Sequence, residues 1–510
     1  IYRGKFAFPA AFVFKGEKMA QINITNLSFN YDGSADSVFE NVNLCLDTDW
    51  RLGLIGRNGR GKTTLLKLLC GIYEYSGKIT TNVEFEYYPY NVKNTRDIVY
   101  NIICEICTAQ QWEMERELSL LELRNDILWR EFDTLSNGER TKVMLAALFL
   151  RENAFLLIDE PTNHLDEKTR GVVAEYLKRK KGFILVSHDR QLLDSCTDHI
   201  LSINRKSIEI RQGNFSSWEQ NRAAQDAFEA AQNEKLTHEI QRLRAAARHS
   251  AQISEGIEKT KKGTRTAGLR PDRGFIGHKS AKMMKRAKVI EKRRENAIEQ
   301  KSSLLQDTEK SENLKLSPLQ SAKNPILTVK NLSCMYNDLI INNPVSFEIS
   351  CGMRVALCGR NGCGKSSILK LICGEDIKHE GGIFKISGLK ISYIPQDASF
   401  LCGGLSDYAK LRGIDESIFK TILRKLDFER VQFEKNMEEF SQGQKKKVLL
   451  AASLCESAHL YIWDEPLNFI DVISRIQIER LLQKYMPTML FVEHDGTFVN
   501  KIATDIIEML

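Results

Sequence analysis

No apolar run in this chain is long enough to cross a membrane. A membrane-spanning helix needs ~20 consecutive apolar residues, and no run reaches that length although 42% of the 510 residues are apolar. The sequence therefore does not predict an integral membrane protein. With 27% charged residues, the composition is typical of a soluble globular protein with room for two domains of ordinary size.

The cysteines lack the pattern of a disulfide framework. Twelve of them are scattered through apolar segments, which favours reduced residues in a protein core. Cys104 and Cys107 form one C-x-x-C with no second pair and no nearby histidine. Two cysteines on one helix face are therefore favoured over a metal or redox site.

The same phosphate-binding pattern is present twice, 303 residues apart. Residues 56–63 and 359–366 both fit G-x-x-x-x-G-K-[ST]. Each copy is followed by a short Ser-x-Gly loop, an apolar strand ending in Asp-Glu and a strand that leads to a histidine. The two loop serines, Ser136 and Ser441, are 305 residues apart. Two complete sets in the same order predict two ATPase domains in one polypeptide.

The chemistry of the pattern explains its residue types. The glycines let the backbone turn tightly, so that successive N–H groups point at the β- and γ-phosphates. Lys62 and Lys365 are predicted to neutralise phosphate oxygens, and Thr63 and Ser366 to place a hydroxyl on Mg²⁺. The predicted cofactors are therefore ATP and Mg²⁺. A chance glycine-rich turn is the alternative, and a second copy argues against it.

Two apolar strands end in adjacent carboxylates. Residues 155–160 end in Asp159 and Glu160, and residues 460–465 end in Asp464 and Glu465. The aspartates suit the Mg²⁺ shell, and the glutamates suit the base that orients the attacking water. Adjacent acids at a strand end are common in proteins. Here each pair follows a phosphate loop and precedes a proline, which favours the catalytic interpretation.

The spacing predicts an α/β fold class with two ATPase domains in tandem. Each half alternates β-branched strands with helical stretches, which is typical of a largely parallel core sheet. We predict the first domain at residues 19–213, a linker at 214–323 and the second domain at 324–510.

The linker predicts a long α-helical hairpin. Residues 214–254 contain no Gly or Pro, and apolar side chains at 236, 240, 243 and 247 follow the spacing of one helix face. Glycines and Pro271 then crowd into residues 256–277, after which residues 278–316 again lack both residue types. Helix, irregular tip and return helix fit this order better than a disordered linker does.

Positive charge is concentrated in the linker. Residues 259–294 contain fourteen Lys and Arg against Asp272 and Glu291, so the net charge of this stretch is +12. The whole chain has a net charge of +7, so the other 474 residues together carry −5. A solvated helix face usually mixes both signs. The segment therefore indicates a polyanionic partner, nucleic acid or an anionic membrane surface.

Residues 1–18 precede the first recognisable strand, and their role is open. They are either upstream sequence read through or a real extension before Met19. Residues 7–14 are mostly apolar after two basic residues, a weak likeness to a signal peptide. Because the two ATPase domains need a cytosolic nucleotide supply, we expect a cytoplasmic protein.

Taken together, the motifs resemble the nucleotide-binding domain of ABC ATPases, in both halves of the chain. In that family the serine loop of one domain closes over the ATP held by the other, so the resemblance pairs Lys62 with Ser441 and Lys365 with Ser136. It implies that His188 and His494 contact the γ-phosphate and act with Glu160 and Glu465 in catalysis. Asp166 and Asp471 match the loop that couples the two sites, and an aromatic residue, Tyr31 or Tyr336, is expected to stack on adenine. The residues expected to bind nucleotide are Tyr31, Gly56, Asn58, Gly59, Gly61, Lys62, Thr63, Thr64, Ser136 and Gly138 in the first half, and Tyr336, Gly359, Asn361, Gly362, Gly364, Lys365, Ser366, Ser367, Ser441 and Gly443 in the second.

The two halves depart from the family pattern in different ways. The glutamine that follows a Tyr-x-Pro strand is present as Gln396, which joins Thr63, Asp159, Ser366 and Asp464 as an expected metal ligand. The first half has Tyr90 at that position. Asn137 and Gln442 replace a usual glycine. The two sites are therefore expected to hydrolyse ATP at different rates.

Two such domains joined by a helical hairpin resemble the ABC-F family of ribosome-binding ATPases. The absence of a long insertion in the first domain resembles the antibiotic-resistance members of this family, and the tip at residues 269–279 is most similar to Lsa-type proteins among them. The resemblance implies a monomer whose two domains pair, and a hairpin that approaches rRNA and P-site tRNA from the ribosomal E site. It also implies protection from lincosamides, pleuromutilins and streptogramin A. The expected RNA contacts lie near the tip, at Lys261, Lys262, Arg265, Arg270, Arg273, Phe275, His278 and Lys279.

Two other functions remain open. One is a housekeeping or stress translation factor without drug protection. The other is the ATPase subunit of a transporter, whose membrane part would be a separate chain and which would not need the basic hairpin. The sequence does not separate direct displacement of a drug from a shift in rRNA conformation.

Overall fold

The computed structural model describes residues 21–31, 37–162, 165, 167–204, 207–225, 315–336, 339–360, 362–428 and 430–509, and isolated helical positions between 227 and 292. One compact unit holds both halves of the repeat, up to residue 216 and from residue 312, and residues 217–311 belong to a second unit. The N-terminal segment 1–18 and the predicted hairpin tip with its RNA-binding residues lie outside the described residues. The hairpin therefore stays a prediction, although residues 215–225 at its start are helical.

The first domain contains two sheets. The core sheet has the order β5-β6-β7-β3-β8-β9 and is parallel except for β9, which pairs with β8 antiparallel. Its strands are β3 (Arg51–Gly56), β5 (Glu84–Tyr88), β6 (Ala154–Asp159), β7 (Phe183–Val186), β8 (His199–Ile203) and β9 (Ile208–Gln212). A smaller antiparallel sheet has the order β2-β1-β4 and consists of β1 (Gln21–Phe29), β2 (Phe39–Asp47) and β4 (Ser76–Thr80).

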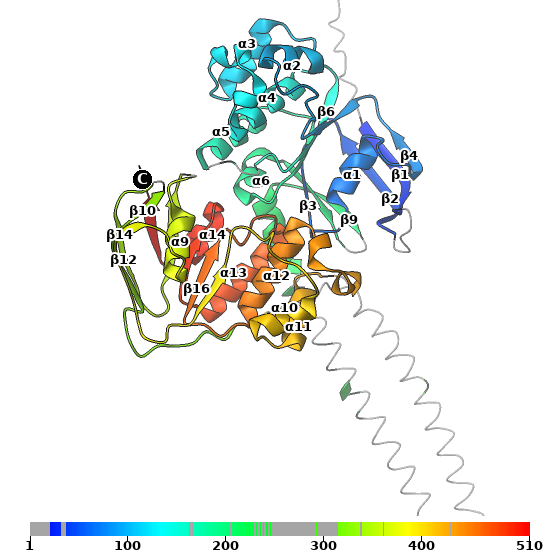
Figure 1. Ribbon diagram of the computed structural model, residues 1–510. Helices are drawn as coiled ribbons and strands as arrows, with labels where there is room; N and C mark the ends of the chain where they lie inside the picture. The colour runs from blue at the N-terminus through cyan, green and yellow to red at the C-terminus, as the bar shows by residue number, and fades with distance from the viewer. Residues whose placement is uncertain are drawn as a thin grey trace, which may run out of the picture. The chain divides into compact units, whose positions relative to one another are not determined.

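Helices of the first domain form two groups. Figure 1 shows α2, α3 and α4 gathered together, apart from the antiparallel sheet beside which α1 lies. The α-helices are α1 (Lys62–Leu69), α2 (Val99–Ile106), α3 (Gln111–Leu120), α4 (Asn137–Phe149), α5 (Glu167–Lys178) and α6 (Arg190–Cys196), and the 3-10 turns are η1 (Asn125–Trp129) and η2 (Phe132–Thr134).

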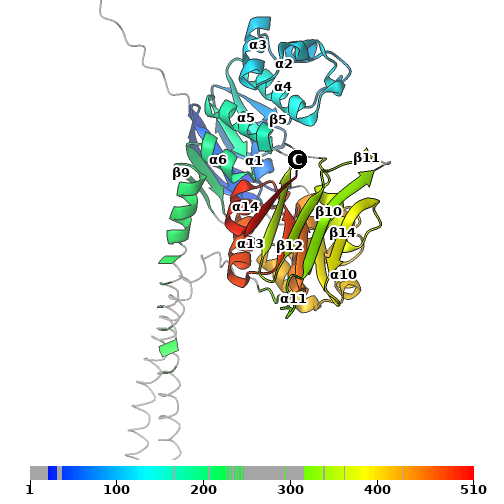
Figure 2. The same cartoon turned by 90° about the vertical axis from the view of Figure 1, so that its left-hand side faces the viewer.

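The second domain repeats this plan. Its core sheet is parallel, with the order β15-β16-β17-β13-β18, and consists of β13 (Arg354–Gly359), β15 (Ile391–Ile394), β16 (Leu460–Asp464), β17 (Met489–Val492) and β18 (Asp505–Met509). Figure 2 shows β10, β12 and β14 side by side in the second sheet. That antiparallel sheet is formed by β10 (Leu327–Tyr336), β11 (Leu339–Ile340), β12 (Val345–Ile349) and β14 (His379–Lys385).

Its helices follow the same order along the chain. The α-helices are α9 (Lys365–Cys373), α10 (Leu405–Arg412), α11 (Glu416–Lys425), α12 (Gln442–Cys455), α13 (Val472–Tyr485) and α14 (Gly496–Ile502), and the 3-10 turns are η3 (Arg430–Glu434) and η4 (Met437–Glu439). The predicted α/β class with two tandem domains is confirmed.

The sequence explains why the core strands lie in the centre. Parallel sheets are covered on both faces, so their strands are almost continuously apolar. Residues 155–158 of β6 and 460–463 of β16 are all buried, and only the carboxylates at the strand ends face the sites. The first phosphate loop follows β3 in the same way, at the carboxyl edge of the sheet where α/β proteins bind ligands. In the parts of the chain that the structure describes, no helix is both long and apolar enough to cross a membrane.

Candidate nucleotide-binding sites

The first phosphate loop turns between β3 and α1. Gly61 precedes the helix with φ of 88°, and a Cβ there would lie 2.8 Å from Val38 and 2.9 Å from Phe39. Only glycine fits this left-handed, crowded position without strain. The Lys62 ammonium donates hydrogen bonds to the Gly56 carbonyl at 2.7 Å and to the Arg57 carbonyl at 3.2 Å. The lysine is thus held at the loop and lines the cavity beside it.

Residues from both domains line the cavity at this loop. The cavity has a volume of about 420 Å³, within the range of small-molecule pockets. The second domain supplies Ser441, Gly443 and Phe469, and the first supplies Tyr31, Asn58, Gly59, Gly61, Lys62, Thr63, Thr64, Asp159, Glu160, Val186 and His188. Ser441 caps α12 by accepting from the Gln444 N–H, and because Ser441 and Gly443 line the cavity, the start of that helix lies at the site. The structure therefore brings Lys62 and Ser441 to one site.

Hydrogen bonds between the domains hold this first site together. The Asn58 side chain donates from Nδ2 to the Phe469 carbonyl at 2.7 Å, and the Asn58 N–H donates to Asp471 Oδ2 at 3.3 Å. A Cβ at Gly443 would lie 2.7 Å from the Phe469 carbonyl oxygen and 3.0 Å from Asn58 Nδ2. Arg60 also pairs with Asp427 at 2.8 Å. The serine loop therefore needs a glycine because two backbones and one side chain meet there.

The carboxylates of the first site are hydrogen-bonded to different partners. Asp159 Oδ2 accepts from the Thr63 hydroxyl at 2.8 Å and from the Tyr87 hydroxyl at 3.0 Å. Glu160 lies on backbone with φ of 51°, a strained conformation for a residue with a side chain, and His188 Nε2 lies 3.3 Å from its Oε1. Burial, followed by the Asp159 charge, raises the pKa of Glu160 to about 8.

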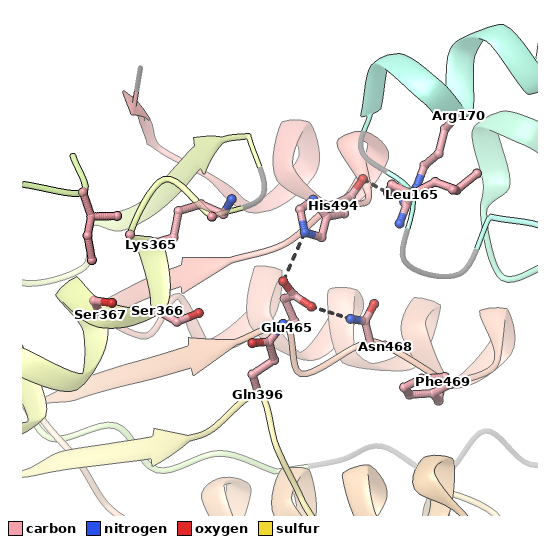
Figure 3. A pocket seen from close by; sticks show the side chains of 13 residues that line it. Leu165, Arg170, Lys365, Ser366, Ser367, Gln396, Glu465, Asn468, Phe469 and His494 are labelled. Atoms are coloured by element: carbon pink, nitrogen blue, oxygen red, sulfur yellow. Dashed lines mark hydrogen bonds and ion pairs between the residues drawn. The ribbon is translucent and has the colours of Figure 1, made fainter. Parts of the chain in front are cut away.

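A second cavity, of about 440 Å³, lies at the other phosphate loop. Figure 3 shows Lys365, Ser366 and Ser367 on one side of it and Glu465 with His494 on another. Gln396, Asn468 and Phe469 complete the second-domain part with Ile341, Gly362 and Gly364. The first domain contributes Leu165 and Arg170, and Arg170 Nη1 donates to the His494 carbonyl at 3.3 Å. Lys365 is held like Lys62, donating to the Gly359 and Arg360 carbonyls at 2.8 Å.

Glu465 has closer partners than Glu160. His494 Nε2 lies 3.1 Å from Oε1, and Asn468 Nδ2 donates to Oε2 at 2.6 Å. Burial opposes ionisation of Glu465, but the hydrogen bond and charge of His494 outweigh it and hold its pKa below the usual range. The backbone of Glu465 has φ of 46°, which matches Glu160. The same strained turn therefore aims the second acid of each pair into its cavity.

The residues at the second site fit a divalent cation. Asp464 is fully buried beside Ser366, and among the residues that the structure describes neither of its carboxylate oxygens has a partner at hydrogen-bond distance and angle. Burial raises the pKa of Asp464 to about 6. An unpaired buried carboxylate is costly unless a cation or a proton compensates it. With the Ser366 hydroxyl and Gln396 close by, this donor set suits Mg²⁺, which prefers oxygen ligands.

Some predicted partners are not brought together. Ser136 caps α4 and accepts from the Glu139 N–H, but neither Ser136 nor Gly138 is among the residues that line the second cavity. Tyr90 is likewise not among those that line the first. The side chain of Tyr336 and all of Asn361 and Asp166 lie outside the described residues. The pairing of Lys365 with Ser136 therefore stays a prediction.

Sequence reasoning missed several side chains at these sites. Tyr87 is one of them. The repeat contains a signal for it, since Tyr87 precedes Pro89 by two residues and Tyr393 precedes Pro395 by the same distance. The Tyr393 hydroxyl is buried with no hydrogen-bond partner among the described residues, and the nearby Asp464 charge, after burial, helps to raise its pKa. Arg170 and Phe469 were also missed. Arg170 contacts the His494 carbonyl and Phe469 contacts Asn58 across the domain boundary, and no local sequence pattern predicts such contacts.

Comparisons with known proteins agree with this geometry. The model of the family described as ABC transporter matches residues 39–163 and 342–468, one match in each domain. The ribosome protection protein VmlR of Bacillus subtilis (strain 168) is 28% identical over 495 residues, which cover 94% of this chain and 85% of VmlR. The ATP-binding protein Uup of Buchnera aphidicola is 29% identical over 514 residues, covering 95% and 80%.

Solved structures are also similar to this chain. An archaeal ribosome recycling factor, aABCE1, solved in complex with the ribosomal stalk protein aP1, has a TM-score of 0.60 at 20% identity over 95% of this chain and 87% of its own. A structure of RNase-L Inhibitor has a TM-score of 0.58, again at 20% identity, over 95% and 87%. At this identity the likeness concerns the fold. The chain therefore contains two ABC ATPase domains in tandem, each built around one of the two phosphate loops.

Proposed function

We propose that this chain is an ATP-dependent, ribosome-binding ATPase of the ABC-F type. The observation that carries the proposal is the first site, where Lys62 and Ser441 line one cavity although they lie in different domains. A site assembled from two domains of one chain links ATP binding to domain closure. The fold is shared with a ribosome recycling factor, and the relative VmlR is named a ribosome protection protein.

The chain's own residues supply most of the chemistry of the proposed reaction. Lys62 and Lys365 hold phosphate oxygens, and the serine loops place helix N-termini against the nucleotide of the other domain. Glu160 and Glu465 orient the attacking water. His188 Nε2 lies 3.3 Å from Glu160 Oε1, and His494 Nε2 lies 3.1 Å from Glu465 Oε1. Mg²⁺, when bound, offsets charge on the β- and γ-phosphates. Its proposed ligands are Thr63 and Asp159 in the first site, and Ser366, Asp464 and Gln396 in the second.

We propose that the task is protection of the ribosome from antibiotics of the peptidyl-transferase centre. The proposed partners are rRNA and P-site tRNA, reached in the cytoplasm from the E site by the basic linker. The concentrated +12 charge of residues 259–294 supports a nucleic-acid partner. When a basic segment binds nucleic-acid phosphates, the counterions of those phosphates are released, and this release favours binding. Lincosamides, pleuromutilins and streptogramin A are the expected drug classes.

Ribosome binding is the first test. The Glu160→Gln/Glu465→Gln protein should co-sediment with bacterial ribosomes when ATP is present and not without it, because slow hydrolysis keeps the domains closed. Neutralising Lys261, Lys262 and Arg265 together should weaken this binding and flatten its salt dependence while ATP hydrolysis by the otherwise unchanged chain continues. No binding at low salt with ATP would contradict the ribosome-directed function.

A housekeeping translation factor is the second candidate. Uup is as similar as VmlR and is named only an ATP-binding protein, so identity does not separate the two tasks. Expression in a drug-susceptible host should raise the inhibitory concentration of a lincosamide or pleuromutilin severalfold, and Glu160→Gln/Glu465→Gln should not. Ribosome binding without any rise in the inhibitory concentration of a drug from any of the three classes would favour the housekeeping function.

A further inference from the structure

A buried cluster of charges joins the two ATPase domains. Arg190, at the start of α6, donates from Nη1 to Glu479 Oε2 at 3.1 Å and from Nη2 to Glu479 Oε1 and to Asp495 Oδ2, the last at 3.0 Å. The side chains are 2%, 4% and 4% exposed. One arginine of the first domain is therefore held by two carboxylates of the second, out of contact with water.

Arg475 extends this cluster into the second domain. Its Nη1 lies 3.3 Å from Asp495 Oδ2, and its other nitrogens donate to the Leu467 carbonyl at 2.9 Å and the Ile470 carbonyl at 3.0 Å. The guanidinium thus fixes the coupling loop, residues 467–471, to the segment that follows His494. We refer to Arg190, Glu479, Asp495 and Arg475 as the ionic joint.

The ionic joint is connected to the first nucleotide site from two directions. The coupling loop that Arg475 holds accepts hydrogen bonds from Asn58 of the first phosphate loop, at the Phe469 carbonyl and at Asp471. On the other side, Arg190 follows His188 of the same site by two residues. Both the phosphate loop and the histidine of the first site are therefore tied to the second domain through one buried cluster.

The repeat lacks a second ionic joint. At the offset of 305 residues that relates Arg170 to Arg475, Glu479 corresponds to Ala174. After the histidines, Asp189 corresponds to Asp495 and Arg190 to Gly496. Both members of the Arg190–Glu479 pair are thus replaced by residues without charge at the symmetry-related position. Arg170, the counterpart of Arg475, lies 3.7 Å from Asp189 and donates to the carbonyls of Leu165 at 3.0 Å and His494 at 3.3 Å. What this position lacks is the Arg190–Glu479 pair.

A second ion pair has the same asymmetry. Arg60 of the first phosphate loop pairs with Asp427 of the second domain at 2.8 Å. The corresponding residues are Cys363 and Glu122, and the positive φ of Glu122 (55°) and Asp427 (62°) supports this equivalence. Because a thiol does not form an ion pair with a carboxylate as a guanidinium does, this contact is also specific to the first site.

We propose that Arg190 and Glu479 are positioning residues that keep the first site assembled between the domains, so that the second site is the one that opens and exchanges nucleotide. This inference rests on the proposed two-site ATPase. A bidentate, desolvated pair holds one geometry far better than an exposed pair does. The asymmetry also provides a reason why the serine loop lines the first cavity and not the second.

Hydrogen exchange of the full chain tests the ionic joint without requiring hydrolysis. Amides of residues 56–63 and 467–475 should be protected both with and without ATP, while those of 135–140 and 359–366 should become protected only with ATP. Arg190→Met/Glu479→Leu removes both charges and leaves similar volume, so no unpaired charge is buried. In that variant, exchange at 56–63 without ATP should accelerate at least tenfold, and exchange at 359–366 should not change.

Hydrolysis measured in two backgrounds separates the sites. In Glu465→Gln, where only the first site hydrolyses ATP, the double substitution should lower the single-turnover rate of hydrolysis about tenfold, and in Glu160→Gln it should change that rate less than twofold. Arg190→Lys retains a charge but loses the bidentate hydrogen bonds, so it should restore only part of the first-site rate. Arg51→Ala, which breaks the half-exposed Arg51–Asp198 pair inside one domain, is the matched control and should leave the exchange at 56–63 unchanged.

Three outcomes have distinct meanings. Equal acceleration of exchange at both phosphate loops, or none at either, would overturn the positioning role of the ionic joint. Full restoration of the first-site rate by Arg190→Lys would show that charge alone is enough and would overturn the role given to the bidentate geometry. Absence of hydrolysis in the parent protein would contradict the ATPase proposal itself, and the exchange pattern would still decide the inference about the joint.

Discussion

Glutamine at both Glu160 and Glu465 should reduce ATP hydrolysis by about 10²–10⁴-fold and leave ATP binding intact. Glutamine keeps the volume and one hydrogen-bond acceptor of glutamate but cannot orient and deprotonate water. In the second site the effect should be clear-cut, because His494 keeps the Glu465 carboxyl ionised and directed into the cavity. Phosphate release and binding of a fluorescent ATP analogue measure the two properties separately.

The single substitutions show how much ATP hydrolysis each of the two sites contributes. Glu465→Gln leaves the first site, and Glu160→Gln leaves the second, so their rates should differ if the sites are as unequal as their hydrogen bonds are. Glu348→Gln, at an exposed position of β12, is the control and should match the parent chain. Rapid multiple turnover by the double variant would disprove the assignment of these glutamates as bases.

What could be predicted from the sequence was local. The phosphate loops, the Asp-Glu strand ends and the serine-capped helices are each encoded within about a dozen residues, and alternating strands and helices were enough to predict the tandem α/β fold, which the structure confirms. The chemistry of each motif depends on the spacing of residues within one short segment, and so it can be predicted from a single sequence.

Contacts across the domain boundary could not be predicted in this way. Asn58 and Phe469 are 411 residues apart, and Arg190 and Glu479 are 289 residues apart. Such pairs depend on how two folded surfaces meet, which no periodicity or motif records. Tyr90 and Gln396 predict unequal rates of hydrolysis at the two sites, and this stays a prediction. The ion pairs that distinguish the two sites are visible only in three dimensions.

Lys447→Met should destabilise the second domain by about 3–5 kcal/mol, the usual cost of leaving one member of a buried ion pair unpaired. Lys447 Nζ lies 3.3 Å from Asp471 Oδ2, and the two side chains are 3% and 0% exposed. Burial opposes ionisation of Asp471, but Lys447 and then Lys62 outweigh it and hold its pKa well below the usual range. Chemical denaturation followed by tryptophan fluorescence measures the loss, since Trp463 lies in this core.

The pH dependence of this stabilisation has a definite sign. Because the folded-state pKa of Asp471 is depressed, the ion pair contributes fully above the unfolded pKa of ~3.9 and its contribution is lost as the pH falls below that value. The difference in stability between the parent chain and Lys447→Met should therefore be constant near neutral pH and shrink in acid. A difference that grew in acid would contradict the ionised state of Asp471.

Removing both partners separates stability from assembly of the site. Lys447→Met/Asp471→Leu removes both charges of the pair, so part of the lost stability should return. The rest should stay lost, because Asp471 also caps α13 by accepting from the Ser474 N–H. The Asn58 N–H would still lack its Asp471 acceptor, and the first site should bind a fluorescent ATP analogue more weakly than in the parent chain. If binding recovered together with stability, Asp471 would be a structural residue of the second domain alone. If binding stayed weak in a stable protein, the carboxylate that stabilises the second domain would also be the one that joins it to the ATP site of the first.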